Sequence, residues 1–205
     1  MASASDPAGP SLSALPGRPG LGAAPQIVVM GVSGCGKSSM GAQLALALGL
    51  AFIEGDSLHP PRNVALMAAG TPLTDADRAD WLATIAQHLG QAQAAGSGLV
   101  VSCSALKRRY RDGLRAACPG LHLVYLHGPA ALLRQRLAAR SGHYMPASLL
   151  DSQLATLEPP GADEAALILD IGLSTAEVVA AALADLQAQS QSRSQSRSQS
   201  HSPAP

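Results

Sequence analysis

A glycine-rich segment in the first quarter of the chain carries the clearest chemistry in the sequence. It reads GVSGCGKS from Gly31 to Ser38 and matches the pattern G-x-x-x-x-G-K-[ST] in full. Its glycines allow backbone angles that turn several N–H groups inward, where they and the N-terminus of a following helix can hold phosphate oxygens. Lys37 can reach the β- and γ-phosphates of a nucleotide, and the Ser38 hydroxyl can ligate Mg²⁺. The expected ATP-binding residues are Gly31, Val32, Ser33, Gly34, Cys35, Gly36, Lys37, Ser38 and Ser39.

The surroundings of this segment distinguish it from a chance glycine-rich turn. The short apolar run Gln26–Met30 precedes it and predicts a strand, and the Ala/Leu-rich stretch from 37 to 48 predicts a helix that stops at Gly49. Strand, loop and helix in this order are what phosphate binding requires. Cys35 lies inside the loop, and we interpret it as a small tolerated side chain rather than a redox switch.

A second cluster of polar residues follows the next predicted strand, Ala51–Glu54. The segment runs EGDSLHPPRN, and Asp56 stands just past the strand end. A carboxylate beside a phosphate loop can accept a proton from an attacking hydroxyl, or hold Mg²⁺ through water. We therefore predict Asp56 as the catalytic carboxylate, and the neighbouring His59 and Arg62 as substrate-binding residues. The chain has no convincing NKxD motif and no clear apolar run ending in DxxG, which disfavours a switch GTPase.

Basic residues follow the third predicted strand, at 99–103. Lys107 and Arg111 are four residues apart and so share one face of a predicted helix. Because arginine can hold a carboxylate with two parallel hydrogen bonds, this face suits an anionic substrate. We predict that Lys107 and Arg111 bind the substrate, whereas we interpret Arg108 and Arg109 as solvated surface charge.

A helix–break–helix segment before the last predicted strand has the pattern of a mobile lid. Arg136 and Arg140 are four apart on the first helix, the sequence SGHYMP breaks that helix, and a second helix is predicted from 147 to 157. Closure of such a lid expels water and brings arginine onto a transferring phosphoryl group. We predict a lid over residues 137–160, with Arg136 and Arg140 as catalytic residues.

Strands and helices alternate along the chain, which predicts an α/β fold with a parallel sheet covered by helices on both faces. Ligands of such sheets bind at the carboxyl ends of the strands, where the residues described above are expected to meet. The predicted strands are Gln26–Met30, Ala51–Glu54, 99–103, 121–127 and 166–171, and the predicted helices are 37–48, 63–69, 74–95, 107–117, 130–140, 147–157 and 175–187.

Both ends of the chain are predicted to be disordered. Residues 1–24 are rich in Ala, Ser, Pro and Gly, and residues 188–205 are a Ser/Gln/Arg tail of low complexity. Neither end can bury enough apolar surface to offset the entropy of ordering. The folded domain is therefore predicted to span 25–187.

Composition and charge restrict the partners of this chain. The formal net charge of zero gives no sign of a nucleic-acid partner. No run of about 18 apolar residues predicts a membrane span. Three cysteines without a CxxC or Cys/His pattern, and an N-terminus without a secretory signal, favour a reducing compartment. We therefore expect a cytoplasmic protein whose partners are small molecules.

Taken together, these segments resemble the gluconokinase family, which belongs to the same class of small P-loop kinases as the adenylate and shikimate kinases. The resemblance rests on GVSGCGKSS, FIEGDSLHPPRNVALMAAGTPLTDADRADWL, VVSCSALKRRYRDGLR and the segment from 124 to 164, and it covers essentially the whole predicted domain. Cys35 and Ala79 are its small departures, and neither removes a phosphate or hydroxyl contact.

The resemblance implies a P-loop NTPase fold of the adenylate/shikimate kinase type, with a five-stranded parallel sheet and a helical lid, in a homodimer. It also implies transfer of the γ-phosphate of ATP, with Mg²⁺, to the 6-hydroxyl of D-gluconate. The product, 6-phospho-D-gluconate, would feed the pentose phosphate or Entner–Doudoroff route. The residues carried over are Asp56 at the acceptor hydroxyl, Arg62, Lys107 and Arg111 at the carboxylate and hydroxyls of gluconate, and Arg136 and Arg140 in the lid.

Three other functions stay open at this point. A kinase that acts on another hydroxy acid, of the shikimate kinase type, would be distinguished from a gluconokinase by a panel of substrates. A nucleotide-binding regulatory ATPase would hydrolyse ATP whether or not gluconate is present, and would need the tails. A protein that binds RNA through its Arg/Ser tail would show salt-dependent affinity for RNA.

Overall fold

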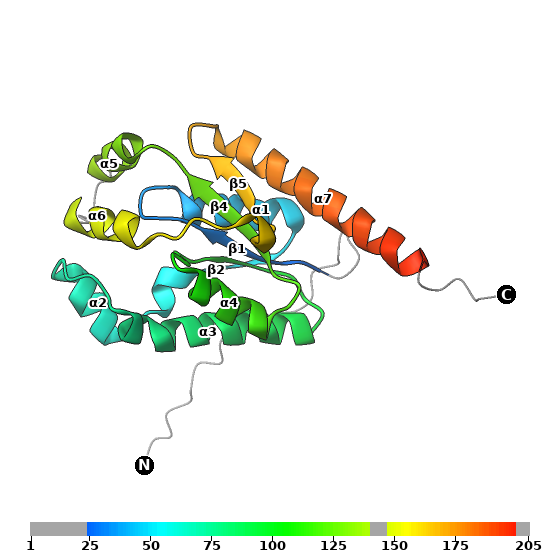
Figure 1. Ribbon diagram of the computed structural model, residues 1–205, viewed down its shortest axis with the longest axis horizontal. Coiled ribbons are helices and arrows are strands. Elements are labelled where there is room, and N and C mark those ends of the chain that lie inside the picture. Colours follow the sequence, from blue (N-terminus) through cyan, green and yellow to red (C-terminus); the bar gives the residue numbers. More distant parts are fainter. Residues whose placement is uncertain (1–23, 140–146, 200–205) are drawn as a thin grey trace, which may run out of the picture.

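Five parallel strands form the centre of the molecule, in the order β2-β3-β1-β4-β5 (Figure 1). The computed structural model describes residues 24–139 and 147–199. Every neighbouring pair of strands is parallel, which confirms the predicted sheet. The strands are β1 (Gln26–Met30), β2 (Ala51–Glu54), β3 (Leu99–Ser102), β4 (His122–His127) and β5 (Leu167–Asp170).

The central strand β1 is buried along its whole length. It pairs with β3 on one side and with β4 on the other, and helices cover both of its faces. A strand in this position appears in the sequence as a continuous apolar run instead of an alternating pattern. The run QIVVM has this form, and the observed bounds of β1 agree with the predicted ones.

Helices cover both faces of the sheet and enclose two apolar layers (Figure 1). On one face, α1 and α7 contribute Leu44 and Val178 to one buried cluster, and on the other face α3 and α4 contribute Ile85 and Leu114 to a second. The helices are α1 (Lys37–Leu48), α2 (Pro61–Ala68), α3 (Asp75–Ala94), α4 (Arg108–Ala117), α5 (Ala130–Ala138), α6 (Ala147–Thr156) and α7 (Thr175–Gln199), with 3-10 turns η1 (Gly55–Leu58) and η2 (Ala162–Glu164).

A capping box starts α3 and so determines which residues its first turns present. The Thr74 hydroxyl accepts a hydrogen bond from the Asp77 N–H at 3.2 Å, and the Asp77 carboxylate accepts one from the Thr74 N–H at 2.8 Å. Threonine at the N-cap with an acidic residue three positions later satisfies two otherwise unpaired backbone donors. This cap places Arg78 and Trp81 in the first two turns of α3, beside the carboxyl ends of β2 and β3.

The last helix is longer than predicted. Its backbone is helical from Thr175 to Gln199, whereas the sequence predicted an end at residue 187 and a disordered tail from residue 188. Gln and Arg have good helix propensity, and neither Gly nor Pro occurs between 188 and 199 to stop the helix. The low complexity of this segment therefore does not prevent it from continuing α7.

Part of the predicted lid lies outside the described residues, namely Arg140 and the break at 141–146, as do residues 1–23 of the predicted N-terminal arm. The helices on either side of the break, α5 and α6, lie next to each other at one end of the sheet (Figure 1). An ion pair of 2.8 Å between Arg134 and Asp151 joins them. Within 24–139 and 147–199, no helix combines the length and apolar character that crossing a membrane requires.

A buried ion pair connects α4 to the segment before β5. Arg111 is fully buried, and its guanidinium holds the Glu164 carboxylate with two hydrogen bonds of 2.6 and 2.7 Å. The same guanidinium donates to the backbone carbonyls of Ala105 and Glu158 at 3.1 and 3.0 Å. Arg115 adds a contact of 2.9 Å to Glu164. These hydrogen bonds, the Arg111 contact first, lower the pKa of the Glu164 carboxyl from 4.5 to about 2.

Glu164→Gln should destabilise the fold strongly, because it leaves the Arg111 charge buried without a counter-charge. We expect a loss of roughly 3–5 kcal/mol in the free energy of unfolding, measured by urea denaturation near neutral pH. Since the carboxyl has a lowered pKa in the folded state, its contribution is complete above about pH 4.5 and is lost as the pH falls toward 2. The difference between wild type and variant should therefore shrink over this range.

Asp163→Asn is the matched control, because Asp163 is the adjacent acid but pairs with Arg108 at the surface, where both side chains are at least half exposed. It should change the free energy of unfolding far less than Glu164→Gln does. Equal losses for the two variants, or a Glu164→Gln loss that does not change with pH, would contradict this assignment.

Candidate active site

The glycine-rich loop after β1 has the backbone geometry that its sequence predicts. Gly31, Gly34 and Gly36 have φ angles of 138°, 85° and 94°, in a region that residues other than glycine rarely adopt. A Cβ atom on Gly31 would lie 2.5 Å from the Leu126 carbonyl oxygen, so the loop passes too close to β4 for any side chain at this position. The backbone of the loop is therefore determined by its glycines.

The loop leads directly into α1, and Lys37 is the first residue of that helix. Its side chain is largely buried and folds back along the loop, where its ammonium group donates to the Val32 carbonyl at 3.1 Å. Ser38 and Ser39 follow in the first turn and are exposed. This arrangement places one cation and the N-terminus of a helix at the same point, as phosphate binding requires.

Asp56 lies beside this loop because of the close approach of β2 and β3 at their carboxyl ends. The Ser102 hydroxyl donates to the Glu54 carboxylate and accepts from the Gly55 N–H at 3.1 Å. A Cβ atom on Gly55 would lie 2.0 Å from the Ser102 carbonyl oxygen, so only glycine fits there. The chain then turns through η1, and Asp56 is exposed in its first turn.

A cleft joins the loop to η1, α2, α3 and α6. Lys37 and Asp56 both line this cleft, so the structure brings together the two residues predicted to act on the phosphate and on the acceptor hydroxyl. His59, predicted to bind the substrate, lines the cleft as well. The other lining residues are Ser33, Met67, Pro72, Leu73, Arg78, Ser104, Leu149, Ser152 and Gln153.

His59 is held in place by two neighbours. Its ring stacks on Trp81, with the ring centroids 4.2 Å apart and the planes 17° from parallel. Its Nδ1 lies 3.3 Å from the side-chain nitrogen of Asn63. Burial lowers the pKa of His59 from 6.5, opposed by the negative charge of Asp56 and assisted by the positive charge of Arg78. The imidazole is therefore mainly neutral near pH 7.

The structure contradicts the predicted role of Arg111. Its side chain is fully buried and committed to Glu164 and to backbone carbonyls, so its guanidinium is not available to a substrate. Arg111 is buried because the face of α4 that carries it packs toward the interior of the protein. Lys107, four residues earlier, lies at the start of α4 and does not share this burial.

Lys107, Arg62 and Arg136 are not among the residues that line the cleft. Arg62 is exposed on α2 and pairs with Asp80 at 3.0 Å. Arg136, on α5, donates to the Ile171 carbonyl at 2.7 Å. In this structure these three predicted site residues therefore have protein partners elsewhere, and Arg140 lies outside the described residues.

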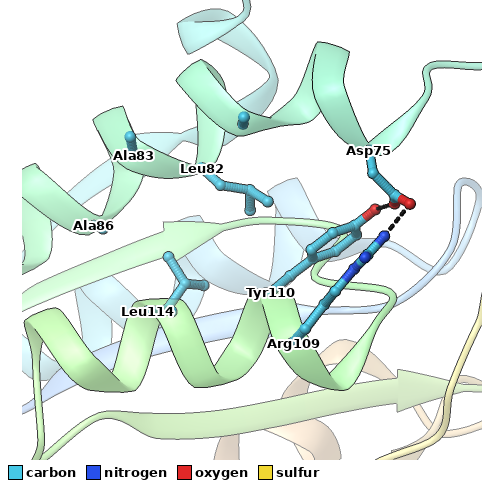
Figure 2. Close-up of a pocket in the computed structure, with 9 residues that line it drawn as sticks. Asp75, Leu82, Ala83, Ala86, Arg109, Tyr110 and Leu114 are labelled. Atoms are coloured by element: carbon cyan, nitrogen blue, oxygen red, sulfur yellow. Dashed lines mark hydrogen bonds and ion pairs between the residues drawn. The ribbon is translucent and has the colours of Figure 1, made fainter.

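Lys107 belongs to a cluster around Asp75 at the first turn of α3. Its ammonium group lies 2.9 Å from the Asp75 carboxylate, which Arg109 and the Tyr110 hydroxyl also contact (Figure 2). These contacts, led by Arg109, hold the pKa of Asp75 well below its usual range. The cluster closes one end of a groove between α3 and α4 whose other lining is mostly apolar, from residues such as Leu82 (Figure 2).

Arg78 and Gln153 are among the cleft residues that the sequence did not predict as site residues. Arg78 follows the α3 cap by one turn, and its place beside the predicted catalytic carboxylate becomes clear only once α3 is packed against η1. Gln153 lies on α6, and its side-chain oxygen accepts a hydrogen bond from the Ser33 N–H of the loop at 2.7 Å. An uncharged residue in an Ala/Leu-rich helix offers no sequence signal for such a contact.

The residues that could contact Mg²⁺ carry oxygen donors. The Ser38 hydroxyl is exposed at the start of α1, and the Asp56 carboxylate is exposed on η1. Mg²⁺ prefers oxygen ligands, and it commonly keeps several waters and binds phosphate oxygens of the substrate. Ser38 and Asp56 therefore fit a Mg²⁺ ion that arrives with a nucleotide. In the part of the chain described, no group of three or more His, Cys, Asp or Glu side chains is placed to hold a metal ion.

This chain is similar to known proteins in both sequence and structure. A family model described as an AAA domain matches residues 27–160. A gluconokinase of Gluconobacter oxydans is 54% identical over 138 residues, which are 67% of this chain and 78% of that relative. The thermoresistant gluconokinase of Escherichia coli is 43% identical over 157 residues, which are 76% of this chain and 90% of that relative.

A solved structure extends the agreement to the whole fold. The crystal structure of a gluconokinase from Sinorhizobium meliloti is 49% identical and superposes with a TM-score of 0.76, covering 83% of this chain and 95% of that one. Both the predicted P-loop kinase fold and the resemblance found in the sequence are confirmed, and the chain belongs to the gluconokinase family.

Proposed function

We propose that this chain transfers the γ-phosphate of ATP to the 6-hydroxyl of D-gluconate, giving 6-phospho-D-gluconate and ADP. The observation that carries the proposal is the shared cleft, in which Lys37 of the phosphate loop and the Asp56 carboxylate lie on one continuous surface. Phosphoryl transfer needs both parts, because one holds the donor phosphates and the other orients the attacking hydroxyl. Membership of the gluconokinase family supports the choice of acceptor.

The position of each residue in the cleft indicates its role in phosphoryl transfer. The loop N–H groups and the N-terminus of α1 hold the phosphates, and Lys37 stabilises the negative charge that spreads over the transferring group. Asp56 Oδ accepts the proton of the acceptor hydroxyl as the new P–O bond forms and the bond to ADP breaks. Ser38, and Asp56 through water, would hold a Mg²⁺ ion, which would supply further charge neutralisation. Arg78 brings a second positive charge to the same cleft.

Two rival functions would use the same loop. A kinase that acts on another hydroxy acid is disfavoured, because the family resemblance includes the segments on the acceptor side as well as the loop. Those acceptor-side segments contain Asp56, His59 and Trp81. A regulatory ATPase is disfavoured because the cleft joins the loop to an acceptor-side carboxylate. A role for Arg140 in the lid stays a prediction.

We further propose a cytoplasmic homodimer without a nucleic-acid partner. Cys35, Cys103 and Cys118 are buried free thiols, which supports a reducing compartment. The zero net charge supports small-molecule partners. The homodimer is what the family resemblance implies.

The reaction itself is tested by measuring ADP release with Mg-ATP, with and without D-gluconate, together with a second enzyme that detects 6-phosphogluconate. We expect both signals to depend on gluconate. A shortened chain of residues 25–187 should keep this activity, because the cleft residues all lie within it. ADP release that gluconate does not change would leave nucleotide binding intact and rule out the assigned acceptor.

Lys37→Ala should lower kcat by a factor on the order of 10³ or more, because it removes the buried cation from the phosphate loop. Lys107→Ala is the matched control, since the other lysine of the chain is held by Asp75 and does not line the cleft. Steady-state kinetics with both substrates would measure both variants. A comparable loss of kcat in the two would show that Lys107 takes part in transfer.

Asp56→Asn should lower kcat by roughly 10²–10⁴ while the affinity for ATP changes little, because the amide cannot accept the hydroxyl proton. Asp80→Asn serves as the control, since Asp80 is an exposed carboxylate on α3 that pairs with Arg62. ATP affinity is measured by titration calorimetry and kcat by the coupled assay. Near-normal turnover of Asp56→Asn would remove this residue from the proton transfer.

A further inference from the structure

Asn63 is a buried polar residue that the reaction described above does not use. It lies in the first turns of α2 and is completely buried. Its side-chain nitrogen lies 2.7 Å from the backbone carbonyl oxygen of Asp77 on α3 and 3.3 Å from Nδ1 of His59. One amide group therefore connects α2, α3 and the histidine of the cleft.

The Asp77 carbonyl determines which way the Asn63 amide points. A carbonyl oxygen can only accept a hydrogen bond, so the Asn63 atom that faces it at 2.7 Å must be the NH₂ group. Turning the amide over would bring two acceptor oxygens together at this distance. The orientation of Asn63 therefore follows from chemistry, although nitrogen and oxygen are similar in size.

The same NH₂ group determines the protonation of His59. Because the amide nitrogen can only donate, Nδ1 of His59 must accept, and so it carries no proton. A neutral imidazole then has its proton on Nε2. Stacking on Trp81 holds the plane of the ring, and the Trp81 indole N–H is itself anchored to the Gly55 carbonyl at 2.7 Å.

Stability alone does not account for an asparagine at this position. Its side-chain oxygen is buried without a hydrogen-bond partner among the described residues. A buried acceptor left unpaired is destabilising, whereas an apolar side chain of similar volume would leave none. The arrangement is explained if the NH₂ group is needed to orient His59.

We propose that Asn63 is a positioning residue that keeps His59 as the Nε2–H tautomer, and that His59 donates this hydrogen to an oxygen of the acceptor acid. The inference rests on the proposed hydroxy-acid kinase function. It gives the two acceptor-side residues opposite tasks, because Asp56 accepts the proton of the reacting hydroxyl while His59 supplies a donor. The charged groups that line the cleft around the imidazole are Asp56 on η1, Lys37 on α1 and Arg78 on α3.

The tautomer is measured by long-range ¹H–¹⁵N NMR of the full chain labelled with ¹⁵N-histidine, with His59 identified by its loss in His59→Gln. Near neutral pH we expect an unprotonated Nδ1 and a protonated Nε2. A protonated Nδ1, or fast averaging between the two tautomers, would overturn the proposal. Because this readout needs no turnover, it is independent of whether gluconate proves to be the acceptor.

Two substitutions at His59 test the donor itself. The side-chain NH₂ of Gln can reach the position of Nε2, whereas that of Asn reaches only the position of Nδ1. We expect His59→Asn to raise the KM for the acceptor roughly five- to tenfold more than His59→Gln, the equivalent of one hydrogen bond, with the KM for ATP unchanged in both. Equal acceptor KM values would contradict a donor at Nε2.

Asn63→Asp and Asn63→Leu test the positioning role. Asp offers only acceptors, so Nδ1 should take up a proton and the neutral ring should lose its hydrogen from Nε2, which raises the acceptor KM. Leu keeps the volume but removes the donor, and should leave the tautomer averaged in the NMR spectrum. If both variants fold and retain the wild-type tautomer and acceptor KM, Asn63 is only structural.

Discussion

Parallel strand pairing is the constraint on which the rest of this structure depends. Because all five strands run in one direction, their carboxyl ends lie at one edge of the sheet, and the loops that leave this edge must share a small space. β1 lies between β3 and β4, so the phosphate loop that follows it passes directly over the end of β4 at Leu126. The glycines of the loop are required by this crowding as much as by phosphate.

The same crowding brings the acceptor side against the donor side. β2 is the outermost strand on one side of the sheet and pairs with β3. The turn after β2 lies against the Ser102 carbonyl, so Asp56 lies next to the loop. α3 then supports this turn through Trp81, whose indole N–H holds the Gly55 carbonyl. The chemistry of the cleft thus depends on backbone contacts between segments that are far apart in the chain.

The sequence predicted the strands and the phosphate loop closely because their signals are local. A strand buried on both faces is a short apolar run, and the loop requires fixed residue types at fixed spacing. Asp56 and His59 could be expected near the loop from the sequence, since both follow a strand end directly, and both line the cleft. These local signals are enough to predict the fold class.

Interactions between distant segments could not be predicted in this way. Spacing of four residues shows that Lys107 and Arg111 share a face, but the burial of Arg111 depends on Glu164, which is 53 residues away. Arg78 and Gln153 reach the cleft only through the packing of α3 and α6. α7 extends to Gln199 because the helix propensity of Gln and Arg outweighs the repetitive composition of this segment.

A crystal structure of the protein with Mg²⁺, a non-hydrolysable ATP analogue and D-gluconate would test most directly whether the cleft is where donor and acceptor meet. We predict the phosphates on the N-terminus of α1, and the 6-hydroxyl of gluconate within hydrogen-bond distance of the Asp56 carboxylate. Gluconate bound elsewhere, for example in the groove between α3 and α4 beside Asp75, with the Asp56 side of the cleft empty, would contradict the assignment of the active site.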